Sequence, residues 1–139
     1  ENEVYEDYHL EFDRKMDLRT YILNEDGLVS DTTEGILDNE DKIRLHKELF
    51  AKDALIFKNI PSKKVVLKSK NSGSILSVEY KDFKNLGIWA KPGAPYVCIE
   101  PWLGIADVEG TDQNLKTKEG IETLAAGKDF QAAYTIDIS

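Results

Sequence analysis

The sequence has few of the residues that build crosslinks, metal centres or membrane helices. It contains one cysteine, Cys98, and two histidines among 139 residues. A single cysteine excludes an internal disulfide and is typical of a reducing cytoplasm. These three residues also lack metal-ligand spacing, and no glycine-rich loop precedes a helix. No apolar run approaches the roughly 20 residues that a membrane helix needs, and no signal-peptide pattern opens the chain. We expect a cytoplasmic protein with no metal, no cofactor and no membrane contact.

Positive charge is scarce overall but unevenly distributed. The formal net charge of −8 argues against a nucleic-acid partner. Residues 1–41 carry 14 acidic and 3 basic side chains, whereas residues 42–91 carry 12 basic and 4 acidic ones. The two stretches are candidates for pairing across a sheet. Solvated strand faces are the favoured interpretation of the lysines, and attraction of an anionic substrate such as a sugar phosphate is the alternative.

Sustained apolar repeats at helical spacing are missing, which points to a β protein. Short alternating or β-rich runs are separated by turn residues at the spacing of a sandwich or barrel. The strands expected from them are 8–12, 19–23, 28–30, 43–45, 54–57, 64–68, 74–80, 86–89, 96–99 and 128–138. The polar stretch 31–41 is expected to be a loop, and 46–51 one helical turn. The pattern predicts an all-β chain, with residues 1–139 forming a single domain.

One carboxylate follows an apolar, β-rich run. Glu100 comes directly after Tyr96-Val-Cys-Ile99 and before Pro101-Trp102. A proline and a charge after such a run predict the end of a strand, with an ionisable group beside an aromatic ring. A carboxylate in this setting is a candidate proton acceptor. Cys98 is expected to be a buried small hydrophobe rather than a nucleophile.

The same region resembles a known family. Leu86-Gly-Ile-Trp89, Val97-Cys-Ile-Glu-Pro-Trp102 and Glu119-Gly-Ile-Glu-Thr-Leu124, in this order, are similar to the C-terminal part of aldose 1-epimerases (galactose mutarotases). The nearest likeness is to the branch associated with bacterial lactose and sugar operons. The resemblance is clear from about Leu45 to Ile138, and the family's chains are substantially longer.

This resemblance implies a fold and an activity. Aldose 1-epimerases are large antiparallel β-sandwiches, so we expect this chain to be the C-terminal half of one, with the missing N-terminal half as its partner. The complete protein would interconvert the α and β anomers of a hexose or related sugar by acid and base ring opening. A carbohydrate-binding module or structural remnant without turnover is the alternative.

Four residues become candidates for the sugar site. The resemblance implies that Glu100 is the catalytic base and that Asp53 binds sugar hydroxyls, for which a turn aspartate at the start of a strand is the alternative. Trp89 and Trp102 are candidate stacking platforms, although for Trp102 a core or rim position is favoured. The family's acid is a histidine whose motif precedes Glu1. Neither His9 nor His46 matches that motif, so we expect the isolated chain to lack half of the proton relay.

Overall fold

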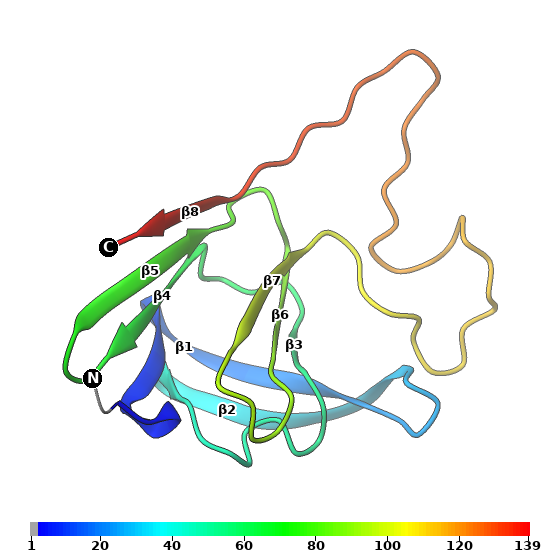
Figure 1. The fold of residues 1–139 in the computed structure, drawn as a ribbon. Helices are drawn as coiled ribbons and strands as arrows, with labels where there is room; N and C mark the ends of the chain where they lie inside the picture. Colours follow the sequence, from blue (N-terminus) through cyan, green and yellow to red (C-terminus); the bar gives the residue numbers. More distant parts are fainter. Residues whose placement is uncertain (1–2) are drawn as a thin grey trace.

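Two long paired strands form the spine of the protein (Figure 1). The structure is a computed structural model that describes residues 3–139. Strands β1 (Tyr8–Leu23) and β2 (Val29–Arg44) run antiparallel, with Leu23 opposite Val29 and His9 opposite Arg44. Asn24 organises the turn between them, because its side-chain oxygen accepts the backbone N–H of Asp26 and of Leu28 at 3.0 and 2.9 Å. The strands expected at 19–23 and 28–30 pair with each other across this turn, and both are longer than the sequence indicated.

The loop expected at 31–41 is wrong, since β2 passes through these residues. Within β2 only Val29, Leu37 and Ile43 are fully buried. Because most of β2 faces solvent, it can be polar and still be held by its hydrogen bonds to β1. The helical turn expected at 46–51 is a run of hydrogen-bonded turns instead, with Leu49 N bonded to His46 O at 3.1 Å and Ala51 N to Glu48 O at 3.0 Å.

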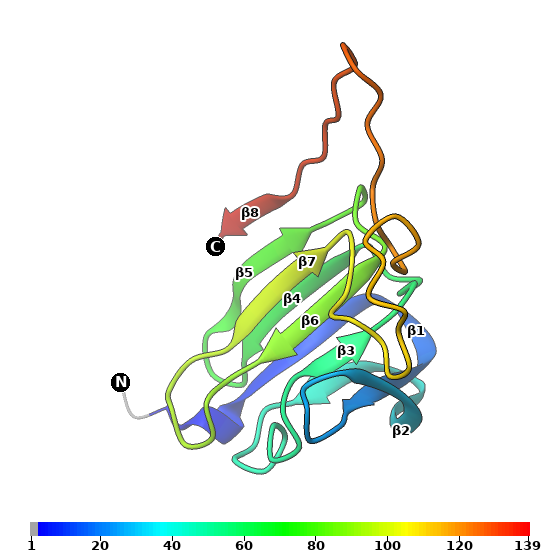
Figure 2. The ribbon, with the colours of Figure 1, turned by 90° about the vertical axis from the view of Figure 1, so that its right-hand side faces the viewer.

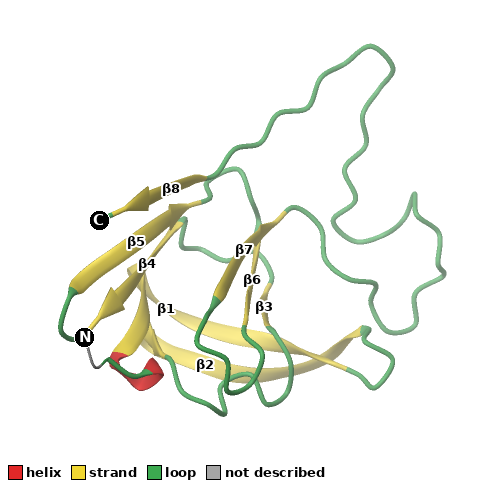
Figure 3. Cartoon of the chain, viewed as in Figure 1, coloured by secondary structure: helices red, strands yellow, loops and turns green. Residues whose placement is uncertain are grey.

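The other edge of β1 carries two short sheets, which we call the first and second limbs. The first limb comprises β3 (Leu55–Phe57), β6 (Asn85–Trp89) and β7 (Cys98–Trp102). The second comprises β4 (Lys64–Ser69), β5 (Gly73–Glu79) and β8 (Thr135–Ile138). Since β2 pairs along one edge of β1, the registers Tyr21↔Ile56 and Leu10↔Leu67 place both limbs on the opposite edge. The sheet therefore curls into two layers, which Figures 1 and 3 show side-on.

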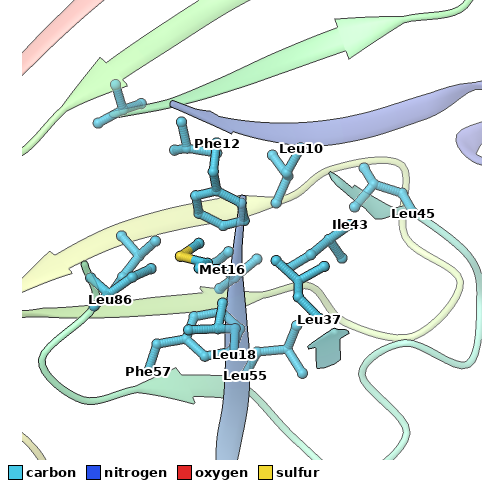
Figure 4. Close-up of a cluster of buried hydrophobic side chains, with 14 of the residues drawn as sticks. Leu10, Phe12, Met16, Leu18, Leu37, Ile43, Leu45, Leu55, Phe57 and Leu86 are labelled. Atoms are coloured by element: carbon cyan, nitrogen blue, oxygen red, sulfur yellow. The ribbon is translucent and has the colours of Figure 1, made fainter. Parts of the chain in front are cut away.

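The hydrophobic core fills the space between the limbs and the spine (Figure 4). Alternate residues of the core-forming strands point inward. Leu86 and Ile88 enter from the first limb and Val65 and Val78 from the second. The spine adds Leu10, Phe12, Met16, Leu18, Leu37 and Ile43. The all-β prediction is confirmed, and the sandwich rests on this shared core.

Two strand ends differ from expectation. The predicted strand 96–99 lies further along, as β7, so Glu100 is its third residue rather than the residue after its end. Because β7 is an edge strand, Pro101 can lie within it without breaking a ladder on both sides. The predicted strand 128–138 is reduced to β8, all four of whose residues are exposed. Before β8, residues 111–134 form a long irregular arm, part of which projects beyond the two limbs (Figure 2).

The charge asymmetry is resolved in part by pairing across strands. The Glu11 carboxylate of β1 accepts a hydrogen bond from Lys68 Nζ of β4 at 2.6 Å and forms an ion pair with Lys42 of β2 at 3.2 Å. Glu34 of β2 forms an ion pair with Lys52 at 3.0 Å. These contacts confirm that the acidic and basic stretches meet. Within residues 3–139 the single helix is the three-residue η1 (Tyr5–Asp7), and no helix there has the length and hydropathy to span a bilayer.

Candidate functional site

Glu100 lies on the face of the first limb that points away from the core. It is paired with Gly87 of β6, which is in turn paired with Ile56 of β3. The residues flanking this row, Leu55, Phe57, Leu86 and Ile88, all enter the core. Strand alternation therefore directs the row itself outward. We call this surface the outer face of the first limb; Glu100 is half-buried on it.

Trp102 shares this face and contacts Glu100 directly. The two residues are two positions apart on β7, and the Trp102 indole Nε1–H donates to Glu100 Oε2 at 3.2 Å. The indole ring covers Gly87 on the neighbouring strand. The structure thus brings together two of the four predicted site residues.

Trp89 lies two rows along the sheet from Glu100, opposite Cys98. It is half-buried, packs against the edge of the core and meets the Tyr96 ring edge-on, with centroids 6.3 Å apart. Edge-to-face contact of this kind fixes the orientation of an aromatic ring. Trp89 is therefore a well-oriented aromatic residue two rows from Glu100.

Asp53 lies in the turn before β3, away from Glu100. Its φ is 81°, in the left-handed region that non-glycine residues rarely adopt, and its carboxylate accepts the Ala54 N–H at 2.6 Å. It lines a separate hollow of about 240 Å³ together with His46 and Lys52. In the described part of the chain, no hydrogen bond or ion pair joins Asp53 to Glu100. The carboxylate caps the start of the strand, as the alternative interpretation expected, while the strained backbone is of the kind that gathers at functional sites.

Neither histidine approaches Glu100. His9 Nε2 lies 3.6 Å from a Glu11 oxygen, and His46 Nδ1 lies 3.4 Å from Glu48. Both histidines therefore lie beside glutamates other than Glu100. Burial and the charge of Glu100 raise the pKa of the Cys98 thiol, which disfavours the nucleophilic thiolate.

Lys58 is a charged residue of the same region that the sequence did not single out. Its side chain is only 13% exposed, its Nζ lies 4.4 Å above the centre of the Tyr21 ring, and it pairs with Glu119 at 3.0 Å. Lys58 follows Ile56 by two positions, so alternation directs it to the outer face as well. Composition alone could not reveal it, because eleven other basic residues share its stretch of sequence.

The arm returns to the outer face through three consecutive residues, which we call the clasp. Lys118 pairs with Asp107 at 2.7 Å, Glu119 pairs with Lys58, and Gly120 packs against the backbone of Gly104. Asp107 and Glu109 in turn bond to Val29 of β2 through their backbones.

The clasp closes one side of an open groove of about 720 Å³ beside the end of β7. The groove is lined by Trp102, Leu103 and Ile105 and by Leu115, Glu119 and Ile121. Trp102 therefore borders both the carboxylate of Glu100 and this groove. Across residues 3–139, no group of three or more histidine, cysteine, aspartate or glutamate side chains is placed to hold a metal ion.

Comparison with known proteins gives this geometry a context. No family model matches the chain. It is 36% identical to the plasmid and chromosomal forms of protein LacX from Lactococcus lactis subsp. lactis, over 99% of this chain and 47% of each relative. A galactose mutarotase related enzyme from Lactobacillus acidophilus has the same fold, with a TM-score of 0.87 and 30% identity over 99% of this chain and 47% of that one.

The fold is galactose mutarotase-like. A second such structure, a galactose mutarotase-like protein from Lactobacillus casei ATCC 334, superimposes with a TM-score of 0.84 at 25% identity, over 96% of this chain and 47% of its own length. The resemblance identified in the sequence is confirmed. The chain spans about half the length of the relatives it matches and corresponds to their C-terminal portion.

Proposed function

We propose that this chain is the base-bearing portion of an aldose 1-epimerase-like protein whose complete form interconverts the α and β anomers of a hexose. The observation that carries the proposal is the placement of Glu100: a half-buried carboxylate, bonded to Trp102, on the outer face of a galactose mutarotase-like sheet. The names of the similar proteins support a role in carbohydrate metabolism. A lone free cysteine suits a reducing compartment, so we propose a cytoplasmic location.

Ring opening requires two proton transfers on a sugar that is held still. A base removes the proton of the anomeric hydroxyl while an acid protonates the ring oxygen, and reclosure on the other face of the carbonyl gives the other anomer. In our proposal Glu100 is the base. Trp89 and Trp102 offer aromatic surface for the sugar ring, and Asp53 accepts bonds from its hydroxyls. Since Asp53 and Glu100 make no mutual contact, the sugar itself would bridge them.

The acid must come from outside the described residues, because neither histidine there contacts Glu100. We propose that a segment equivalent to the N-terminal half of the relatives supplies it, within the same polypeptide or as another subunit. The same observation favours a second function, a carbohydrate-binding module or structural remnant without turnover. The two are distinguished by whether a histidine from another segment reaches Glu100.

The test is Glu100→Gln in a longer protein that joins this chain to such an N-terminal segment. The amide keeps the shape of the side chain and loses its basicity, so turnover measured by polarimetry of α-glucose should fall by about 10²–10⁴-fold. Sugar binding, measured by calorimetry, should survive. Glu79→Gln is a matched control, because Glu79 is exposed and pairs with Lys64 on the second limb. Unchanged turnover in Glu100→Gln would remove this residue from the mechanism.

A further inference from the structure

The absence of a side chain at Gly87 leaves room for the indole ring of Trp102. A Cβ placed on Gly87 would lie 2.3 Å from Cζ2 of Trp102 and 2.7 Å from Cε2 and Cη2. All three distances are too short for any real carbon contact. The φ of Gly87 lies outside the left-handed region, so the requirement for glycine at this position is steric rather than conformational. The indole lies directly on the β6 backbone, and a side chain at position 87 would displace it.

The displaced ring would take a hydrogen-bond donor with it. The indole Nε1–H donates to Glu100 Oε2 at 3.2 Å, and Glu100 is the cross-strand partner of Gly87. The three residues form a closed unit: Gly87 supports the ring, the ring orients the N–H, and the N–H binds the carboxylate. Within the described residues, Oε2 is the Glu100 oxygen that accepts a hydrogen bond, while Oε1 accepts none.

We propose that Gly87 and Trp102 are positioning residues for Glu100, which fix its carboxylate by Oε2 and leave Oε1 to take the proton of the anomeric hydroxyl. This inference rests on the proposed function, because it assigns the role of base to Glu100. It gives Trp102 a task distinct from stacking against the sugar. One face of the ring lies against β6, and its polar edge is committed to Glu100.

The hydrogen bond can be observed in the 139-residue chain without any turnover. Two tryptophans give two indole N–H resonances in a ¹⁵N-labelled sample, and Trp89→Phe identifies which belongs to Trp102. We expect Glu100→Ala to shift the Trp102 indole proton upfield and to abolish its protection from solvent exchange, while the Trp89 resonance stays in place. Glu79→Ala, on the second limb, should move neither resonance.

Gly87→Ala should reproduce this change although it leaves both bonding partners intact, because its methyl group displaces the ring. Backbone amide spectra establish that the variant remains folded. If it does not fold, Trp102→Phe provides the second test: in the longer protein, it should lower kcat by about ten- to a hundredfold with KM unchanged, whereas loss of a stacking platform would raise KM.

The positioning role would be overturned if the Trp102 indole resonance did not shift in Glu100→Ala. It would also be overturned if Trp102→Phe raised KM and left kcat unchanged. These outcomes are separable from failure of the proposed function. If Glu100→Gln abolishes turnover while the Trp102 indole resonance does not shift in Glu100→Ala, only the positioning inference fails. If Glu100→Gln retains full turnover, the base role itself fails.

Discussion

Glu11 shows how single residues of this protein couple charge to stability. Its side chain is about three-quarters buried between the spine and the second limb, and its carboxylate forms ion pairs with Lys68 and Lys42. The hydrogen bond from Lys68 holds the pKa of Glu11 below its usual value near 4.5, against the opposing effect of burial, and Lys42 contributes in the same direction as Lys68. A depressed carboxylate pKa stabilises the folded state fully above the unfolded value, and this stabilisation is lost as the pH falls through the folded value.

Glu11→Gln should therefore lower the free energy of unfolding by about 1 kcal/mol at pH 7. The difference from the unsubstituted chain should shrink as the pH falls below about 4.5 and through the lower folded-state pKa of Glu11, below which both chains are uncharged at this position. Urea unfolding curves between pH 3 and 7 measure this directly. Glu34→Gln is the matched control, because Glu34 and Lys52 are both largely exposed and their pair should contribute little. A constant difference across the pH range would contradict the assignment.

Some individual residues were predictable from sequence and others were not. Glu100 could be identified because an apolar β-rich run isolates it, and the paired charges of the first 91 residues because their asymmetry is strong. Gly87 and Lys58 were missed. A glycine inside a strand is the known signal for close approach of another group, but the sequence does not say which group approaches. The partner Trp102 is 15 residues away and is brought to Gly87 only by the pairing of β6 with β7.

Among the elements, the clasp is held by backbone contact as well as by charge. Gly120 has φ 75°, and a Cβ there would lie 3.0 Å from the Cα of Gly104. Gly127, further along the arm, has a similar φ of 72° and nothing within 4 Å of its Cβ position. The two glycines therefore share the conformational requirement and differ in the steric one.

Gly120→Ala should consequently loosen the clasp more than Gly127→Ala does. Each substitution costs about 1–2 kcal/mol for a left-handed alanine, and only Gly120→Ala adds a collision with backbone. Limited proteolysis of residues 107–125 should be accelerated clearly more in Gly120→Ala. Equal cleavage rates in the two variants would show that the contact with Gly104 does not hold the segment.

The elements themselves were predictable where one face is buried. The runs in β3 to β6 were recognised because they are short apolar or alternating segments bounded by turn residues. By contrast, the middle of β2 was not predicted as a strand, because its exposed residues are polar and it pairs with β1 alone. Residues 128–134 alternate as a strand does, yet they find no pairing partner within the described residues until β8 begins at Thr135. Periodicity indicates which side chains share an apolar face, whereas strand formation also requires a neighbouring strand to pair with.

At the scale of the whole molecule, the second limb and the arm expose apolar side chains that no described residue covers. The core face of the second limb continues from Val78 to Ile136 and from Leu76 to Ile138, where both isoleucines are more than half exposed. Leu115, Leu124 and Phe130 on the arm are exposed as well. Contiguous apolar surface beside an unpaired strand edge favours association with another polypeptide. This surface is suited to the N-terminal segment that we propose as the partner.

On its own, the 139-residue chain should leave the mutarotation of α-glucose close to its uncatalysed rate, because no acid lies beside Glu100 in the described residues. Polarimetry at increasing chain concentration measures this. Adding a polypeptide equivalent to the N-terminal half of the relatives provides the control, and a rate increase would be expected only with it. Rapid equilibration by the chain alone would refute the proposed division of the proton relay.

The long β1–β2 hairpin also has a consequence for the order in which the sheet assembles. Its turn, closed by Asn24, joins strands that are adjacent in sequence, so its contacts form at a small loss of chain entropy. The pairs β4–β5 and β6–β7 are also local in sequence, but they reach the spine only through β4 and β3, which pair with β1 at much larger sequence separations. We expect the hairpin to form early in the folding transition state and β7, which brings Glu100 and Trp102 to Gly87, to join late. The residues proposed for chemistry would thus be among the last to reach their places.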